Sequence, residues 1–201
     1  MLTKKQRIKK HLFDISVSLF LLLISAVPLL VLWIITTIDT GRNGLFVQER
    51  IGRLGKPFKL YKFRTLKGDG HQDIKAIDSD KTRIGNWLRT TKLDELPQLF
   101  NVLKAEMSLV GPRPDITGYA DQLQGEDRIL LSVKPGITGP ATIKYKNEDR
   151  LLLQQLDPKV YNDEVIWPDK VAINKEYVMN WSLQKDIRYL LESVMGVGSV
   201  E

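Results

Sequence analysis

The sequence predicts a helix-rich α+β fold, in which a long apolar helix precedes a small domain of short strands and amphipathic helices. One observation is a run of 24 residues, 15–38, that contains no charged side chain. A second is the alternation of apolar and polar residues over 58–64, which is typical of a half-buried strand. A third is a set of apolar stripes at helical spacing in the second half of the chain. The length of 201 residues allows one ordinary domain with an appendage.

Composition and charge exclude several classes of protein. With 43% hydrophobic and 27% charged residues, the chain is not wholly disordered. The absence of cysteine excludes disulfide scaffolds, zinc–cysteine sites and thiol catalysis, and two histidines, His11 and His71, cannot build a histidine-rich metal cage. The net charge of +6 divides into +4 over residues 1–38, +6 over 39–113 and −4 over 114–201. This division indicates a membrane surface and a phosphate site rather than a nucleic-acid partner.

The uncharged run is long enough to cross a bilayer. As a straight helix it would measure about 36 Å at ~1.5 Å per residue, against a hydrocarbon core of ~30 Å. A signal peptide would have a shorter apolar region followed by a small-residue cleavage site. A buried core helix usually has only roughly 10–14 apolar residues. The run therefore predicts membrane association.

The topology of this segment stays open on the residues alone. Five basic side chains precede the run, and residues 39–64 add seven against two acids. Basic flanks on both sides suit a helix that enters and leaves at the same face of the membrane. Pro28 predicts a kink, because it lacks a backbone donor and its ring clashes with the carbonyl of Ile24. A kinked re-entrant helix and a spanning helix with a tolerated proline both fit.

The rest of the chain reads as short elements separated by turns. Turn signals at 41–44 and 52–55 precede the first strand. The later helices each carry one apolar stripe, so they are amphipathic and could lie at a membrane interface. In chain order we expect a strand over 58–64, a loop over 67–82, a helix over 93–103 and a short strand over 107–110. Three helices follow, over 116–133, 151–156 and 182–195.

Two adjacent carboxylates are the first candidates for chemistry. Asp94 and Glu95 lie near the start of the helix predicted over 93–103. Neighbouring carboxylates can hold a hard cation such as Mg²⁺, and one of them can act as a nucleophile. The structural alternative is a helix cap, because Thr91 three residues before Asp94 resembles a capping box and acids are common in a first helical turn.

Basic side chains are the candidates for phosphate binding. Arg113 lies between Pro112 and Pro114, which restrict its backbone and would preset its guanidinium for bidentate phosphate recognition. Lys62 and Arg64 are one strand period apart and would share a face. The alternative to phosphate binding is that Arg113 is a solvated side chain in a rigid turn, and that Lys62 and Arg64 are solvated or contact lipid headgroups.

A series of short motifs follows the basic N-terminus and the apolar segment with Pro28 in a fixed order. They are Gln48-Glu-Arg-Ile-Gly52, Lys62-Phe-Arg-Thr65, Leu93-Asp-Glu-Leu-Pro-Gln-Leu99, Asn101-Val102, Met107-Ser-Leu-Val-Gly-Pro-Arg-Pro114, Lys134-Pro-Gly-Ile-Thr-Gly139 and Tyr177-Val-Met-Asn-Trp-Ser182. In this order the chain resembles the minimal catalytic form of the monotopic phosphoglycosyl transferases of bacteria, also called bacterial sugar transferases or undecaprenyl-phosphate sugar phosphotransferases.

The resemblance implies a reaction and a location. The family transfers a phosphosugar from a nucleotide sugar, usually a UDP-sugar, to polyprenyl (undecaprenyl) phosphate, which gives a polyprenyl-diphosphate sugar and UMP. This is the first membrane step of bacterial glycan assembly, as in exopolysaccharide or lipopolysaccharide biosynthesis. It also implies a re-entrant membrane helix within residues 1–40 and a catalytic domain over 41–201 on the cytoplasmic face of the inner membrane.

The resemblance also implies roles for the candidate residues. Asp94 would be the nucleophile that forms an aspartyl-phosphosugar intermediate, and Glu95 would assist with Mg²⁺ or proton transfer, so that both are expected at the metal. Arg113 would contact phosphate or nucleotide. Because a carboxylate must approach an anionic diphosphate, Mg²⁺ and fixed cations have to offset the repulsion, and the expected cations are Lys62, Arg64, Arg89 and Arg113.

The expected partners are a UDP-sugar donor, a polyprenyl phosphate acceptor and membrane lipids, with a homodimer left open and no nucleic acid. The alternative is a non-catalytic membrane-tethered protein that binds anionic lipid. Two positions and one stretch depart from the family's pattern. The stretch is Gly139-Pro-Ala-Thr142, which differs from the commoner Gly-Trp-Ala pattern in a region that could bear on the choice of sugar. Val27 precedes the kink proline where serine is common, so a hydroxyl for the freed carbonyl would have to come from elsewhere, such as Ser25, or be absent. Ala105 stands where glycine is frequent. The sequence does not indicate the sugar or the glycan.

Overall fold

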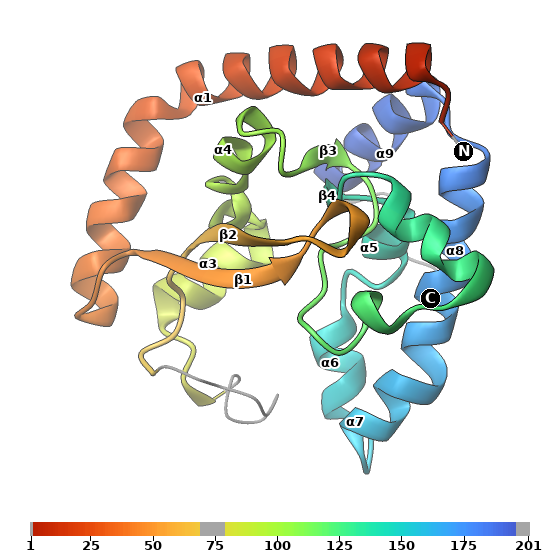
Figure 1. The fold of residues 1–201 in the computed structure, drawn as a ribbon. Coiled ribbons are helices and arrows are strands. Elements are labelled where there is room, and N and C mark those ends of the chain that lie inside the picture. The colour runs from red at the N-terminus through yellow and green to blue at the C-terminus, as the bar shows by residue number, and fades with distance from the viewer. Residues whose placement is uncertain (1, 69–78, 196–201) are drawn as a thin grey trace.

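The computed structural model describes residues 2–68 and 79–195, which form a helix-rich α+β fold with two small sheets (Figure 1). The helices are α1 (Lys4–Thr40), α3 (Arg83–Thr91), α4 (Gln98–Leu103), α5 (Pro140–Lys144), α6 (Glu148–Leu153), α7 (Pro158–Tyr161), α8 (Trp167–Met179) and α9 (Leu183–Met195). The strands are β1 (Leu45–Ile51), β2 (Pro57–Phe63), β3 (Ser108–Val110) and β4 (Gly136–Thr138). The strands predicted over 58–64 and 107–110 and the helix over 182–195 are thus confirmed, whereas most of the loop predicted over 67–82 lies outside the described residues.

Helix α1 contains the whole apolar run and is bent. It begins with a capping box between Thr3 and Gln6, and it bends along its length (Figure 1), with Pro28 as its internal proline. The bend agrees with the kink predicted for this residue. The Ser25 hydroxyl donates to the carbonyl of Leu21 at 2.5 Å, and not to the carbonyl of Ile24 that Pro28 leaves free. Ser25 therefore does not supply the hydroxyl, the first of the two alternatives for this position.

Both arms of α1 lie on the same domain. Near its N-terminus, Lys10 Nζ lies 2.6 Å from Asp186 Oδ2 of α9, and Asp14 Oδ2 accepts a 2.7 Å hydrogen bond from Ser108 Oγ of β3. At its C-terminal end, Thr37 Oγ1 accepts a 2.9 Å hydrogen bond from the amide of Gly44, at the entry of β1. Leu22, between the two ends, belongs to the hydrophobic core.

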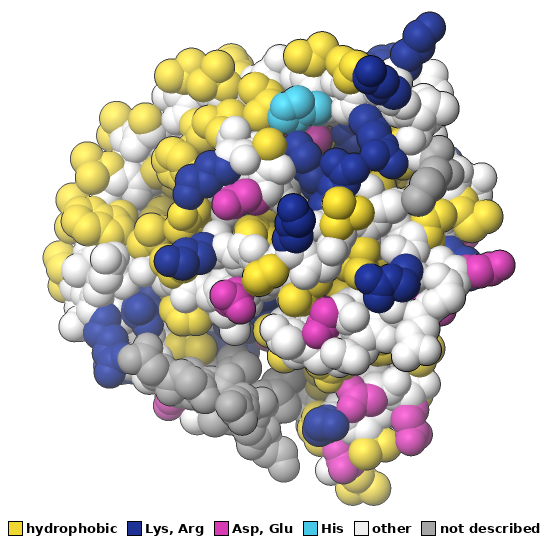
Figure 2. Space-filling model, in the orientation of Figure 1, with side chains coloured by type: hydrophobic (Ala, Val, Ile, Leu, Met, Phe, Trp, Pro, Cys, Tyr) yellow, Lys and Arg dark blue, Asp and Glu magenta, His cyan; other side chains and the backbone are white. Residues whose placement is uncertain are grey.

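Much of the remaining surface of α1 is apolar and uncovered. Within the described ranges α1 is the one helix long and apolar enough to cross a membrane, and only 17% of its most apolar window is buried. Hydrophobic side chains gather along the edge of the molecule where α1 lies (Figure 2). A core helix would be mostly buried, so this exposure supports membrane association.

The two small sheets hold the segments that carry the candidate residues. β1 and β2 form an antiparallel hairpin in which Leu45 pairs with Phe63 and Gln48 with Leu60. β3 pairs with β4 in parallel, with Ser108 opposite Gly136. A Cβ atom at Gly136 would collide with the backbone of Gly111, so the close approach of these two segments requires glycine.

Three helix predictions differ from the structure. The helix over 93–103 is divided into a 3₁₀ turn, Leu93–Glu95, and α4, because Pro97 begins the new helix as its N-cap. The segment 116–133 forms 3₁₀ turns at Ala120–Gln122 and Gly125–Ser132, since Gly118 and Gly125 adopt positive φ values of 104° and 55° that interrupt a helix. The helix over 151–156 is α6, which spans Glu148–Leu153.

Candidate active site

The two adjacent acids are presented by a tight turn between α3 and α4. Lys92 ends α3 in the left-handed conformation, with φ 58°, and the 3₁₀ turn Leu93–Glu95 follows at once. The capping box expected at Thr91 is not formed, because the Thr91 hydroxyl donates to the carbonyl of Trp87 instead. Asp94 is therefore not part of a capping box, although it does lie in the first turn of this 3₁₀ segment.

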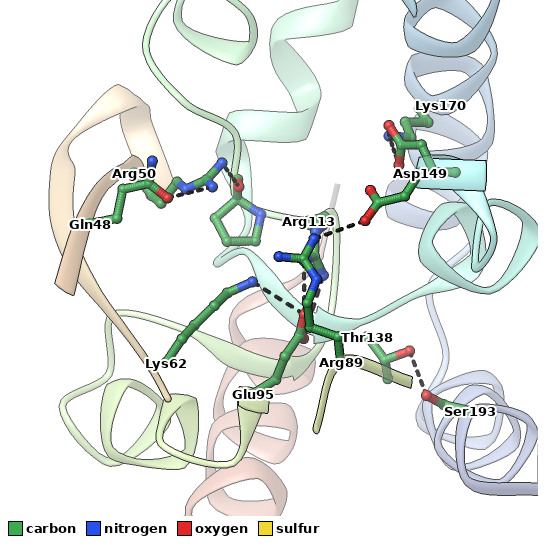
Figure 3. Close-up of polar contacts among 12 residues, drawn as sticks. Gln48, Arg50, Lys62, Arg89, Glu95, Arg113, Thr138, Asp149, Lys170 and Ser193 are labelled. Carbon is green, nitrogen blue, oxygen red and sulfur yellow. Dashed lines mark hydrogen bonds and ion pairs between the residues drawn. The ribbon is translucent and has the colours of Figure 1, made fainter. Parts of the chain in front are cut away.

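Glu95 lies between two cations that converge on it (Figure 3). Arg113 Nη2 donates to Glu95 Oε1 at 2.8 Å and Arg113 Nη1 to Oε2 at 3.5 Å, while Lys62 Nζ lies 3.3 Å from Oε1. Burial opposes ionisation of Glu95, but Arg113 and Lys62 outweigh it and hold the pKa of Glu95 well below its usual range. Glu95 is thus a permanently charged anchor for two basic side chains.

Asp94 has the opposite environment. It is buried, and its Oδ1 atom has no hydrogen-bond partner among the described residues. Burial raises the pKa of Asp94 above its usual value, although Lys62 opposes the shift. An unpaired buried carboxylate oxygen costs free energy, so its retention indicates that a ligand or substrate completes it.

Lys62 and Arg113 differ in exposure and in acidity. Burial lowers the pKa of Lys62 to about 8, even though Glu95 favours its charged form. The carboxylate of Glu95 raises the pKa of Arg113, which stays charged at every relevant pH. The side chain of Arg113 is 37% exposed and opens to the cavity, so one guanidinium edge is available to a phosphate while the other holds Glu95.

A cavity of about 1240 Å³ brings the predicted site residues together. Asp94, Glu95 and all four expected cations line it, namely Lys62, Arg64, Arg89 and Arg113. Arg64 Nε donates to the carbonyl of Asn43 at 2.9 Å, and Arg89 Nη2 lies 2.8 Å from Asp149 Oδ2. Arg64 and Arg89 therefore border the cavity with hydrogen bonds of their own. Among the residues that the structure describes, Lys62 and Arg113 are the cations that form ion pairs with Glu95.

The loop that carries Arg113 is held from two sides. The amide of Gly136 in β4 donates to the carbonyl of Pro112 at 2.8 Å, and the amide of Ile51 in β1 donates to the carbonyl of Asp115 at 2.9 Å. Arg50 adds a 3.4 Å hydrogen bond to the carbonyl of Pro114 (Figure 3). These bonds and the two prolines fix the arginine before any ligand arrives.

Sequence reasoning missed several polar residues of the same cavity. The cavity is also lined by Arg50 of β1, by Lys92 at the end of α3, by Asp115 after the Pro-Arg-Pro loop and by Lys170 of α8. Arg50 belongs to the motif 48–52 and Asp115 directly follows Pro114, so adjacency to motifs was the one signal available. Lys170 lies in a helix that the residue pattern did not reveal.

The donor set suits magnesium only with help from a substrate. Within the described ranges there is no cluster of three histidine, aspartate or glutamate side chains that could hold a metal ion. Mg²⁺ commonly uses one or two carboxylates and completes its shell with water and substrate phosphates. The unpaired Oδ1 of Asp94 fits such a site, whereas Glu95 is already neutralised by Arg113 and Lys62.

Comparison with known proteins agrees with these features. The bacterial sugar transferase family model matches residues 5–199. The uncharacterised sugar transferase EpsL of Bacillus subtilis is 35% identical over 192 residues, which cover 94% of this chain and 87% of the relative. The undecaprenyl-phosphate galactose phosphotransferase of Salmonella typhimurium is 33% identical over 209 residues, and the UDP-glucose:undecaprenyl-phosphate glucose-1-phosphate transferase of Klebsiella pneumoniae 36% identical over 194. The matches cover 94% and 92% of this chain but 40% and 39% of those longer proteins.

A cavity whose charged groups are mainly basic surrounds a buried carboxylate, in a chain that also has an exposed apolar helix, and this combination suits an enzyme that handles phosphate groups at a membrane. The chain belongs to the bacterial sugar transferase family, which confirms the resemblance found in the motifs. It is accordingly a phosphoglycosyl transferase.

Proposed function

We propose that the protein transfers a sugar phosphate from a UDP-sugar to polyprenyl (undecaprenyl) phosphate, and that Asp94 carries the phosphosugar between them. The observation that carries the proposal is the unpaired Oδ1 of Asp94, buried in a cavity whose other charged groups are mainly basic. The names of the Salmonella and Klebsiella relatives support undecaprenyl phosphate as the acceptor and a sugar 1-phosphate as the transferred group.

The reaction proceeds in two displacements. The Asp94 carboxylate attacks the phosphorus that bears the sugar, the bond from this phosphorus to the bridging oxygen breaks, and UMP leaves with that electron pair. A phosphate oxygen of polyprenyl phosphate then attacks the same phosphorus, and the Asp94 carboxylate is released unchanged. The products are polyprenyl-diphosphate sugar and UMP.

The residues around Asp94 lower the electrostatic cost of both steps. Arg113 and Lys62 supply fixed positive charge beside the carboxylate that has to approach a diphosphate. Glu95 keeps these two cations in place and maintains the protonated form of Lys62. When bound, Mg²⁺ would neutralise charge on the diphosphate, with Asp94 as the protein contact, because Glu95 is already bound by Arg113 and Lys62.

Two contacts of α1 support a location at the membrane. Lys10 binds Asp186 near one end of the helix, and Thr37 accepts a hydrogen bond from the Gly44 amide near the other, so both ends contact the same domain. We infer that α1 is re-entrant and that the domain lies on the cytoplasmic face of the inner membrane, where nucleotide sugars are available. Apolar side chains exposed on α9, Ile187, Leu191 and Val194, would rest at the interface.

The proposed reaction is tested by the release of UMP from UDP-sugars in the presence of polyprenyl phosphate and Mg²⁺. We expect Asp94→Asn to lower the rate by on the order of 10³-fold or more, because the substitution removes the nucleophile. Asp121→Asn is the matched control, since Asp121 lies outside the cavity and binds only nearby backbone and Gln122. Equal rates in Asp94→Asn and wild type would refute the role of Asp94. No release by the wild type would favour the lipid-binding alternative.

A further inference from the structure

The cavity has a second polar wall, formed by lining residues other than the acidic pair and its expected cations, whose hydrogen-bonding groups are incomplete. Three cavity-lining residues each have a buried side-chain atom without a hydrogen-bond partner among the described residues: Nε of Arg50, Oγ1 of Thr142 and Oδ1 of Asn174. Asn174 is only 6% exposed. Buried polar atoms without partners are rare in folded proteins, and each costs about 1–3 kcal/mol. Three on one cavity wall indicate a missing polar ligand.

These groups come together from separate elements. Arg50 lies in β1 and Thr142 in α5, which packs against α8, while Asn174 lies on α8 one turn after Lys170. Asp115, next to the Pro-Arg-Pro loop, also lines the wall and interacts electrostatically with Arg50 and Lys170. Burial raises the pKa of Asp115 to about 6, even though Lys170 and Arg50 oppose the shift. The wall is therefore formed by the tertiary fold and not by one local motif.

The chemistry of the wall suits hydroxyl groups better than phosphate. Arg50 Nε is a donor, the Asn174 Oδ1 and Asp115 oxygens are acceptors, and the Thr142 hydroxyl is both. A phosphate accepts hydrogen bonds only and would be repelled by Asp115. A sugar hydroxyl donates and accepts, so it can satisfy each member of this set. The polyprenyl chain of the acceptor has no such groups.

The position of the wall relates it to the transferred phosphate. Arg113 interacts with Glu95 beside Asp94 and also with Asp115 on the second wall. A phosphate bound by Arg113 would thus lie between the nucleophile and the second wall. That phosphate carries the sugar of the donor on one side and, through the second phosphate, the uridine ribose on the other.

We propose that Arg50, Asp115, Thr142 and Asn174 form a subsite for the hydroxyl groups of the hexose that is transferred, and that this subsite selects among UDP-sugars. This inference rests on the proposed function and deepens it. Ribose carries the same hydroxyl chemistry, so the experiment must separate the two sources.

The test compares kcat/KM for two UDP-sugars that differ at a single hydroxyl, in wild type, Thr142→Val, Asp115→Asn and Asn174→Ala. The same variants are assayed for inhibition by UMP, which carries the ribose without the hexose. Thr90→Val is the matched control, because Thr90 also lines the cavity but its hydroxyl already donates to the carbonyl of Asn86 in its own helix. Thermal melting checks folding, and Thr142→Val and Asp115→Asn preserve side-chain shape should Asn174→Ala not fold.

We expect at least one variant to change the selectivity between the two donors by about tenfold, the equivalent of one hydrogen bond, with inhibition by UMP unchanged. Thr90→Val should keep the wild-type selectivity. If kcat/KM falls equally for both donors and inhibition by UMP becomes weaker, the wall binds ribose, and the proposal is overturned. Wild-type selectivity in all three variants would also overturn it while leaving the proposed reaction intact. No turnover by the wild type would instead remove the proposed function, and the subsite with it.

Discussion

Asp94 and Glu95 are neighbours in sequence with opposite ionisation behaviour. Arg113 and Lys62 keep Glu95 charged, whereas burial without a hydrogen-bond partner at Oδ1 raises the pKa of Asp94. Two carboxylates whose environments separate their pKa values commonly have separate roles. Here Glu95, which stays charged, holds the cations in place, and Asp94, which has an unpaired oxygen, is the group that reacts.

The dependence of turnover on pH tests this division at the residue scale. Asp94 must be ionised to attack, so the rate should rise as pH rises through its elevated pKa. Lys62 must be protonated, so the rate should fall as pH rises above about 8. Lys62→Arg should move the alkaline limb to higher pH, because arginine stays charged. An alkaline limb that is unmoved in Lys62→Arg would show that another group causes it.

Ala105 offers a second residue-scale prediction. It has a φ of 60°, a conformation that glycine adopts without strain and in which a Cβ costs about 1 kcal/mol. We expect Ala105→Gly to raise the free energy of unfolding by up to about 1 kcal/mol, measured by denaturant titration. Ala172→Gly, on the exposed side of α8, is the control and should lower it by about 0.5–1 kcal/mol. The same sign for both substitutions would contradict this account of position 105.

At the scale of elements, α1 and β3 are joined by a buried polar contact. Asp14 accepts a hydrogen bond from Ser108 Oγ at 2.7 Å and one from the Leu109 amide at 3.3 Å. β3 leads directly into the loop of Arg113. The start of the apolar run is thereby connected to the candidate active site through three residues of strand.

A double-mutant cycle measures this connection. We expect Asp14→Ala and Ser108→Ala each to destabilise the protein, with a coupling energy of about 0.5–3 kcal/mol between them, because the two side chains contact each other while buried. UMP release measured on the same proteins should fall in Asp14→Ala as the Arg113 loop loses support. Additive effects on unfolding would show that the contact contributes nothing specific.

The elements also show what the sequence could predict. β2, β3 and α9 have clear alternation or helical stripes and were found with small boundary errors. The break between Leu93–Glu95 and α4 depends on the left-handed Lys92, which residue periodicity does not reveal. Motif order points to the acidic pair, Pro28 and three of the cations, whereas Arg89 lies outside the motifs and was expected only because a diphosphate needs fixed positive charge. Arg50, Asp115, Thr142 and Asn174 come from separate elements, and only tertiary packing brings them to one wall.

At the scale of the whole molecule, the proposed arrangement at the membrane depends on α1. Its bend, its exposed apolar surface and its two contacts with one domain favour re-entry over spanning. We expect tags at the N-terminus and at the C-terminus to be protected alike from membrane-impermeant labelling in intact cells, and to become labelled together after permeabilisation. Labelling of one tag alone in intact cells would establish a spanning helix and refute the re-entrant arrangement.

The central claim, that Asp94 carries the phosphosugar, is tested most directly by trapping the intermediate. Purified protein is incubated with a UDP-sugar and Mg²⁺ in the absence of polyprenyl phosphate, then quenched and examined by intact-protein mass spectrometry. The account predicts a mass increase equal to one sugar phosphate on wild type, located at Asp94 by peptide mapping, removed by addition of polyprenyl phosphate and absent from Asp94→Asn. A wild type that turns over with both substrates but never gains this mass, or an Asp94→Asn variant that gains it, would contradict the account.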